Sequence, residues 1–366
     1  MVSWLTKKHA MGMNLITLTP MMCGGIIPTK TGMIAEFEFT VNAKQHQKPL
    51  LECVLPMIPY LSLEKWQDLI HKGLVRRNGV VVEHAETVSE GDVIAYVVPD
   101  HSEDEVNTRW RWLWNDADIA VIAKPENLPV NRTTRNVYNT LIQLLRRESP
   151  WPDAHLLHRL DAETSGLLLV GRNNDVAKQR QANLNQWLHT KEYLAVVKGA
   201  PSWRHMSLSA PLKERSDSDI RSKMYVQHDG KVSETELEVL SVGKGASLIL
   251  CRLKSGRKHQ IRAHLAHLGL PIIGDKMYSM DGQYYLKRVS QHYLSAGDYE
   301  ALESDHHLLH CWRLGWQWNG QKQVVVDDHI PANMKRVCDH YGVSLASVMD
   351  GLDQHQHCAL PFHFHE

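Results

Sequence analysis

An aspartate beside an apolar run is the residue best placed for chemistry in this sequence. Asp161 lies two residues after Arg159 and shortly before residues 167–170, whose apolar character indicates a buried strand. Gly166 lies between them and permits a tight backbone path. A carboxylate held at the edge of a core strand can take part in catalysis, and it can equally form an ion pair that ends the strand. Both interpretations stay open on these residues alone.

A second region supplies a cation. Residues 259–268 carry apolar side chains at helical spacing, and a glycine and a proline then follow as a stop. Arg262 lies off that apolar face, within about one turn of the loop that carries Arg257. Residues 251–290 contain eight Lys and Arg against two Asp and Glu, although the formal net charge of the whole chain is zero. This region therefore carries a local positive field of the kind that attracts nucleic acid.

Five segments, taken together and in order, resemble the signature motifs of RluA-type pseudouridine synthases. The resemblance covers residues 108–330, and its most characteristic segment is His-Arg-Leu-Asp-Ala-Glu-Thr-Ser-Gly. One departure is Glu126-Asn127, which stands where a glycine is common and concerns only a local turn. The five segments are residues 119–130, 158–166, 191–199, 256–264 and 309–314.

The resemblance implies isomerisation of uridine within RNA, in which the base is detached, turned and rejoined through carbon. Asp161 matches the catalytic aspartate and would be the nucleophile, and Arg262 matches the arginine that pairs with it. Tyr193 matches a tyrosine that lies against the flipped uracil and relays a proton, although a tyrosine on an apolar strand is more often a core residue. Arg159 matches an arginine that fills the space the base leaves.

The remaining expected contacts are to substrate, with no cofactor. Lys124 and Arg257 fit either phosphate contacts or scaffold roles. No metal is expected, because His259, His264 and His267 lie on one helix without a cysteine or carboxylate partner pattern. The residues expected to bind substrate are Arg159, His158, Lys124, Thr164, Arg257, His259 and Gln260.

The chain of 366 residues is long enough for two domains. A helix at 63–71 capped by Ser62, a hairpin turning at Asn78-Gly79 and a strand within 88–98 resemble the ribosomal-protein S-four type of RNA-binding module. Residues 41–100 nevertheless hold six Lys and Arg against eight Asp and Glu, so this module is not basic. The expected organisation is an extension (1–32), a small module (33–100), a linker (101–116), a pseudouridine synthase catalytic domain (117–340) and a His-rich tail (341–366).

The expected fold class is α+β, with a mixed, mainly antiparallel sheet and flanking helices, plus the small α+β module. Strands are expected at 236–242, 248–253 and 324–326, with few crossover helices to support a doubly wound sheet. The segment 213–231 is expected to be a flexible insertion near the substrate. Helices are expected at 139–147 and 174–188.

The expected location is the cytoplasm, and the expected state is a monomer. The six cysteines form no Cys-x-x-Cys pair, which suits free thiols in a reducing compartment. No run reaches the roughly 18 uninterrupted apolar residues that a membrane helix needs, so no membrane association is expected.

Two other functions compete with RNA isomerisation. A nucleoside glycosidase could use Asp161 as nucleophile with Glu163 as the acid. A non-catalytic RNA-binding assembly factor could keep the catalytic domain only as a scaffold. The target RNA also stays open, since residues 131–140 resemble members that act on transfer RNA, whereas the N-terminal module suits those that act on ribosomal RNA.

Overall fold

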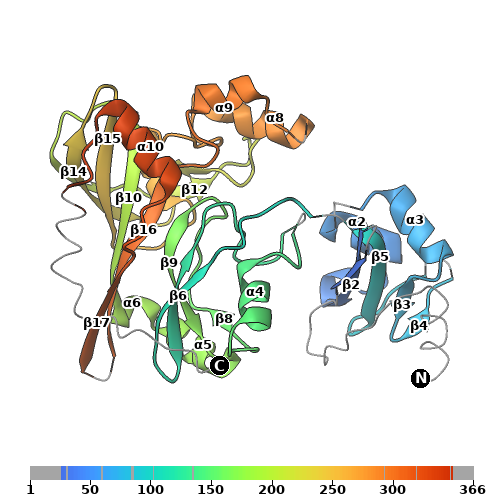
Figure 1. Ribbon diagram of the computed structural model, residues 1–366. Coiled ribbons are helices and arrows are strands. Elements are labelled where there is room, and N and C mark those ends of the chain that lie inside the picture. Colours follow the sequence, from blue (N-terminus) through green and yellow to red (C-terminus); the bar gives the residue numbers. More distant parts are fainter. Residues whose placement is uncertain are drawn as a thin grey trace. The chain divides into compact units, whose positions relative to one another are not determined.

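The computed structural model describes most of the chain (Figure 1). The first 25 residues of the expected extension and the expected tail from residue 349 onward lie outside the described residues. The described residues are 26–29, 32–58, 61–83, 86–101, 103–133, 136–291, 293–318, 320–346 and 348.

The chain forms two compact units. The smaller comprises the described residues up to Glu105 together with Arg132–Tyr138, and the larger comprises Val106–Asn131 and the described residues from Asn139 onward. The domain boundaries expected from the sequence, and the resemblance of residues 33–100 to the ribosomal S-four module, stay predictions. The described part of the smaller unit has an antiparallel sheet of order β1-β2-β5-β3-β4. Its elements are β1 (Ile26–Thr29), β2 (Gly32–Thr40), η1 (Ala43–Gln45), α2 (Leu50–Met57), α3 (Leu63–His71), β3 (Val75–Arg77), β4 (Val80–Val81) and β5 (Val93–His101).

Local signals set several elements of the smaller unit. The side chain of Ser62 accepts a hydrogen bond from the backbone N–H of Lys65, which caps α3 as expected. Asn78 and Gly79 both have positive φ angles, of 51° and 81°, as a tight hairpin turn requires. The indole of Trp66 packs against Tyr96 in the core, with the ring centroids 4.8 Å apart.

The larger unit is built on one broad sheet (Figure 1). Its order is β11-β14-β15-β10-β16-β9-β7-β6, with β17 beside β16 and β8 beside β9. Every pairing in it is antiparallel except that of β16 with β9. The strands are β6 (Arg111–Asn115), β7 (Ile119–Lys124), β8 (His155–Leu156), β9 (Ser165–Gly171), β10 (Leu188–Lys198), β11 (His205–Ser209), β14 (Glu234–Val242), β15 (Ala246–Leu253), β16 (Leu309–Trp318) and β17 (Gln321–Val326).

Helices flank this sheet, and α10 packs against β15 (Figure 1). The expected mixed α+β fold with a mainly antiparallel sheet is confirmed. The segment expected as a flexible insertion contains a two-stranded sheet, β12 (Leu212–Glu214) with β13 (Met224–Val226), which shares a small apolar cluster with Ala263 of α7. No helix in the described residues is both long and apolar enough to cross a membrane. The helices are α4 (Leu141–Glu148), α5 (Asn174–Ala182), α6 (Leu184–Trp187), α7 (Gln260–His267), η2 (Met280–Gly282), α8 (Gln283–Gln291), α9 (Ala296–Leu302) and α10 (Ala332–Tyr341).

The parallel contact between β9 and β16 depends on a glycine. Gly166 pairs with Cys311, and its φ angle of 103° lies in a region that L side chains rarely adopt. A Cβ atom at this position would lie 2.1 Å from the carbonyl oxygen of Cys311. Only glycine therefore allows β9 to begin beside β16 directly after the loop that carries Asp161.

Candidate active site

Asp161 and Arg262 form an ion pair at the edge of the sheet. Arg262 Nη1 lies 2.7 Å from Asp161 Oδ2. The Asp161 side chain is 30% exposed, whereas that of Arg262 is 8% exposed. Burial by itself would raise the pKa of the Asp161 carboxyl, but the Arg262 charge, aided by His259 and His307, lowers it far below its usual range. The result is an ionised carboxylate that is partly open to solvent.

Asp275 holds the other side of the same guanidinium. Arg262 Nε and Nη2 lie 2.7 and 2.9 Å from the two Asp275 oxygens, and Asp275 is fully buried. The Asp275 carboxylate also accepts hydrogen bonds from the backbone N–H groups of Met277 and Tyr278. The two contacts with Asp275 fix the orientation of the planar guanidinium, so Arg262 presents Nη1 to Asp161 with little rotational freedom.

His259 precedes α7 and faces the same carboxylate. Its φ angle of 54° places it in the left-handed region, and its Nε2 lies 3.8 Å from Asp161 Oδ1. The ring meets Tyr278 edge to face, with centroids 5.9 Å apart. Burial, which outweighs the attraction of Asp161, lowers the pKa of His259 to about 4, so the imidazole is neutral at neutral pH.

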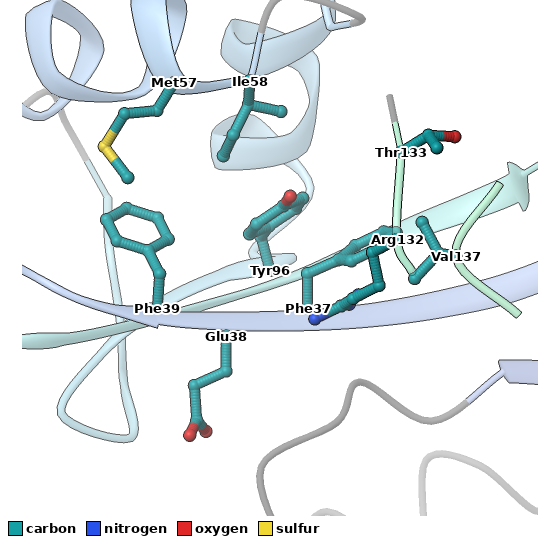
Figure 2. Close-up of a pocket in the computed structure, with 9 residues that line it drawn as sticks. All are labelled: Phe37, Glu38, Phe39, Met57, Ile58, Tyr96, Arg132, Thr133 and Val137. Atoms are coloured by element: carbon teal, nitrogen blue, oxygen red, sulfur yellow. The ribbon is translucent and has the colours of Figure 1, made fainter. Parts of the chain in front are cut away.

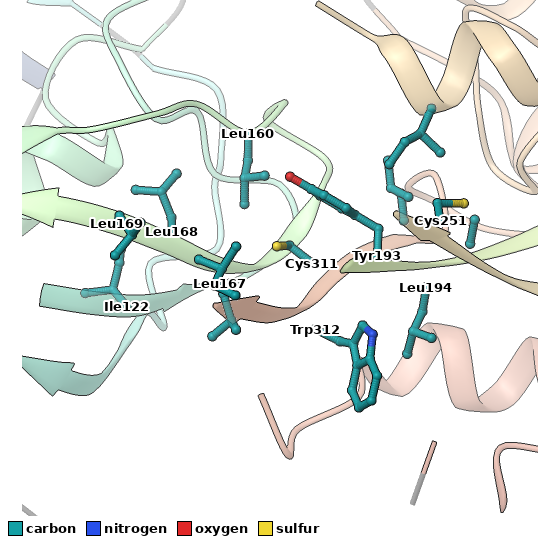
Figure 3. Packing of buried hydrophobic residues seen from close by; sticks show 14 of the residues in the cluster. Ile122, Leu160, Leu167, Leu168, Leu169, Tyr193, Leu194, Cys251, Cys311 and Trp312 are labelled. Atoms are coloured by element: carbon teal, nitrogen blue, oxygen red, sulfur yellow. The ribbon is translucent and has the colours of Figure 1, made fainter. Parts of the chain in front are cut away.

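Tyr193 lies on β10 between two neighbouring strands. It pairs with Cys251 of β15 on one side and Cys311 of β16 on the other. Figure 3 shows its hydroxyl pointing toward Leu160, the residue before Asp161. Burial, together with Cys311 and Asp161, raises the pKa of Tyr193 well above its ordinary value. The phenol therefore stays protonated and can serve as a proton donor or a stacking surface.

The Glu163 carboxylate contacts two cations, Lys276 and Arg288, and the imidazole of His307. Its Oε1 lies 2.8 Å from Lys276 Nζ and 3.5 Å from Arg288 Nη1, and its Oε2 lies 3.4 Å from His307 Nδ1. Burial would raise the pKa of Glu163, but Lys276 and His307 lower it well below the usual value. A carboxyl that stays ionised in this way cannot donate a proton as a general acid near neutral pH.

The Lys124 side chain is buried and contacts three backbone carbonyls. Its ammonium donates to the backbone carbonyls of Pro125, Leu128 and Ala162 at 2.8, 2.9 and 2.8 Å. Burial, opposed by the nearby carboxylates of Asp161, Glu126 and Glu163, lowers its pKa to about 7. Lys124 thus joins the end of β7 to the residue directly after Asp161, and it is only 1% exposed. Of the two roles that the sequence allowed, these contacts favour the scaffold.

The other residues expected to contact the substrate are either exposed or engaged in contacts within the protein. Arg159 and Arg257 are exposed. Arg159 forms no hydrogen bond or ion pair with the residues that the structure describes. The ring of His158 instead accepts a hydrogen bond from the backbone N–H of Leu169, and the Thr164 hydroxyl contacts His307. Gln260 is buried, and its amide joins Glu234 and Thr235 to the 255–257 loop. Substrate binding by these residues stays a prediction.

Sequence reasoning missed Asp275, Lys276, Tyr278 and His307. One signal was present for Asp275, because it is one of two acidic residues within the basic region 251–290. An isolated carboxylate among eight cations is a natural partner for one of them. The sequence carried no comparable signal for His307, which lies 143 positions from its partner Thr164.

The smaller unit contains a separate hollow of about 170 Å³ (Figure 2). Phe37 and Phe39 of β2, Tyr96 of β5 and Met57 of α2 give it a mainly apolar lining. Its one carboxylate, Glu38, points away from the aromatic rings in Figure 2. Nothing in this hollow reproduces the ion pair found around Asp161. In the described parts of both units, no cluster of three or more His, Cys, Asp or Glu residues could hold a metal ion.

Comparison with known proteins identifies the family of this chain. Residues 118–267 match the family model described as RNA pseudouridylate synthase. The chain is 33% identical over 229 residues to ribosomal large subunit pseudouridine synthase D of Xylella fastidiosa, covering 61% of this chain and 68% of that protein. It is 31% identical over 224 residues to an uncharacterized RNA pseudouridine synthase, YlyB, of Bacillus subtilis, covering 58% and 73%. The structure of human RNA Pseudouridylate Synthase Domain Containing 1 has a similar fold, with a TM-score of 0.52 at 20% identity over 70% of this chain and 100% of that one.

Proposed function

Because this chain belongs to the RNA pseudouridylate synthase family, we propose that it isomerises uridine in RNA with Asp161 as its nucleophile. The observation that carries the assignment of Asp161 is its contact with Arg262, at 2.7 Å. The arginine keeps the carboxylate ionised and aimed, while the exposed part of the same side chain stays available to a substrate. A carboxylate needs no general base to become a nucleophile at neutral pH, since a free Asp titrates near ~3.9.

The proposed reaction balances without a cofactor. The Asp161 carboxylate bonds to C1′ of the ribose as the C1′–N1 bond breaks, and the uracil leaves with that electron pair. After the base turns, C5 bonds to C1′ and the carboxylate is released. C5 then loses its proton, and N1 gains one. A duplex uridine must first be extruded, at a cost of a few kcal/mol.

Neighbouring side chains have separate roles in this proposal. Tyr193 lies against the extruded uracil, and its protonated hydroxyl relays the proton between the base positions. Arg159, which is exposed, fills the space that the base vacates. Arg257 contacts phosphate from its exposed position, which is consistent with the basic character of residues 251–290.

The decisive experiment measures pseudouridine formation in bulk cellular RNA by the purified protein. Wild-type protein should convert uridine, and Asp161→Asn should abolish conversion, because the amide keeps the shape and loses the nucleophilic charge. Asp328→Asn is a matched control, since this carboxylate is 76% exposed and lies 3.7 Å from an arginine of the same unit. Equal conversion by wild type and Asp161→Asn would remove Asp161 from the mechanism.

The same assay separates the two competing functions. A nucleoside glycosidase would release free uracil, yet its required acid, Glu163, is kept ionised by Lys276. A non-catalytic assembly factor would bind RNA and produce no pseudouridine. We expect pseudouridine without free uracil.

For the target, we propose large-subunit ribosomal RNA, with transfer RNA as the alternative. Support comes from a curated relative, 33% identical to this chain, that is named as a ribosomal large subunit enzyme. Mapping pseudouridines across all RNAs in cells with and without the gene tests this proposal, because the missing site identifies the substrate. We further propose that the protein acts as a monomer in the cytoplasm, which light scattering of the purified protein and cell fractionation would check.

A further inference from the structure

Two buried histidines contact the hydroxyl groups that follow the nucleophile. His307 Nε2 lies 2.7 Å from Thr164 Oγ1, and His310 Nδ1 lies 3.0 Å from Ser165 Oγ. None of these four residues is more than 5% exposed. The contacts join the loop after Asp161 to the start of β16, at a distance of more than 140 positions along the chain.

Each imidazole has a carboxylate near its other nitrogen. His307 Nδ1 lies 3.4 Å from Glu163 Oε2. His310 Nε2 lies 3.7 Å from Asp327 Oδ2, too far for a hydrogen bond, and has no hydrogen-bond partner among the described residues. A carboxylate favours the tautomer with the proton on the nitrogen that faces it. The opposite nitrogen then carries the lone pair, so the Thr164 and Ser165 hydroxyls donate to it. We assign both tautomers from these partners.

The two carboxylates are themselves fixed. Lys276 Nζ lies 2.8 Å from Glu163 Oε1, and Arg111 forms an ion pair with Asp327. Burial lowers the pKa of His310 to about 4, in keeping with a neutral ring that accepts a proton from Ser165. Each hydroxyl therefore contacts an imidazole whose other nitrogen faces a carboxylate, and between Asp327 and His310 this approach is electrostatic only.

These contacts hold the nucleophile loop independently of the reacting carboxylate. The backbone N–H of Thr164 donates to the Asp161 carbonyl at 3.1 Å, which links the hydroxyl contacts to the nucleophile's own backbone. When Asp161 bonds to the ribose it loses its negative charge, and its attraction to Arg262 weakens. The contacts of His307 and His310 with the two hydroxyls do not depend on the Asp161 charge. They therefore persist while Asp161 is covalently bonded to the ribose.

We propose that His307 and His310 are positioning residues that keep Asp161 aligned through Thr164 and Ser165 during both bond exchanges. The proposal rests on Asp161 being the nucleophile. It also reassigns Thr164, which the sequence placed among the substrate contacts, because its hydroxyl is buried and faces His307.

The test compares matched variants in single-turnover assays with saturating enzyme. Thr164→Val keeps the side-chain shape and removes the hydroxyl, whereas Thr164→Ser keeps the hydroxyl. We expect Thr164→Val to slow conversion of bound RNA about tenfold to a hundredfold, since a small misplacement of a reacting group has effects of this order. Thr164→Ser should restore most of the rate, and the Kd for RNA should stay unchanged in both variants.

A double-mutant cycle shows whether the hydroxyl acts through the histidine. The His307→Phe/Thr164→Val protein should be no slower than the slower of the two single variants, because both substitutions break the same contact between Thr164 and His307. His307→Gln, which can still accept a hydrogen bond near the Nε2 position, should retain more activity than His307→Phe. Ser165→Ala and His310→Asn repeat the comparison at the second contact, and Ser165→Ala decides the test if Thr164→Val fails to fold.

Three results would overturn the proposal: wild-type rates for folded Thr164→Val and Ser165→Ala, additive effects in the cycle, or a loss confined to RNA affinity. Failure of the proposed function looks different. If Asp161→Asn is inactive while both hydroxyl variants keep the full rate, only the positioning role is wrong. If Asp161→Asn is as active as wild type, the nucleophile assignment is wrong as well.

Discussion

Arg262 and Asp161 are 101 positions apart in the sequence, and their side chains meet at 2.7 Å. The two remaining nitrogens of the guanidinium are engaged by Asp275 at 2.7 and 2.9 Å. Arg262 is therefore committed to carboxylates on both sides and has no free edge for a phosphate. This geometry separates a role in orienting the nucleophile from a role in binding RNA.

The first prediction concerns Arg262→Lys. A lysine keeps the charge but cannot bridge two carboxylates with a planar fork. We expect turnover of bound RNA to fall by about a hundredfold, with RNA affinity changed by less than about threefold. Single-turnover rates and filter binding measure the two quantities, and Arg252→Lys, at an arginine paired with Glu192, is the control. Reduced affinity with normal turnover would instead make Arg262 a phosphate contact.

The second prediction concerns Asp275. Its carboxylate is fully buried and compensates the charge of Arg262. Asp275→Ala leaves that guanidinium with one partner, so we expect a loss of about 3–5 kcal/mol in the free energy of unfolding. Urea denaturation measures it. A loss below about 1 kcal/mol would mean that Asp161 and solvent compensate Arg262 sufficiently.

The third prediction concerns the phenol of Tyr193. Tyr193→Phe keeps the ring that is proposed to lie against the base, and it removes the hydroxyl. If the hydroxyl relays a proton, turnover should fall by about 10²–10⁴-fold while RNA affinity holds. Because burial raises the pKa of Tyr193 well above its ordinary value, wild-type activity should show no loss from tyrosine ionisation up to about pH 10. A Phe variant with the full rate would leave the ring with a stacking role alone.

The fourth prediction concerns Gly166→Ala. The added Cβ would lie 2.1 Å from the Cys311 carbonyl oxygen, at a φ angle of 103°. We expect a loss of at least about 3 kcal/mol in the free energy of unfolding, or no soluble protein, because the clash is with backbone. Gly256→Ala is the matched control, since nothing lies within 4 Å of its Cβ position. Thermal unfolding of both variants should show a loss only for Gly166→Ala.

The fifth prediction concerns the pH dependence of stability. Burial lowers the pKa of His158 and of His310 from 6.5 to about 4. Between these values the unfolded chain binds protons that the folded chain does not. Stability from these rings is thus complete above pH 6.5 and is lost as the pH falls toward about 4, by up to about 1.4 kcal/mol per pH unit for each ring. Urea denaturation between about pH 7.5 and 5 should show the decline, and His310→Asn should have a shallower slope.

Elements governed by local signals were predictable from the sequence. The helix at Leu63–His71 begins and ends at the expected residues because Ser62 caps it and Gly73 follows it. The expected helix over 174–188 was too long. It divides into α5 and α6, and β10 already begins at Leu188, because pairing with Trp316 of β16 overrides the local preference of that residue.

The single sequence determined which residues are proposed to carry the chemistry. The types and order of the motifs pointed to Asp161, Arg262 and Tyr193, and the family membership is confirmed. Each motif contains the residues that neighbour one of these side chains along the chain. For Asp161 the motif includes Gly166, the glycine that lets β9 begin beside β16.

Only the tertiary structure decided how those groups are held. The contacts of His307 with Thr164 and of Lys124 with Ala162 join segments that have no common spacing in the sequence. The energies of these contacts depend on burial, because a buried polar side chain that lacks a hydrogen-bond partner costs free energy. Such a side chain therefore pairs with the polar groups that the fold places next to it. Burial is a property of the packed chain, so no pattern along the sequence could specify these partners.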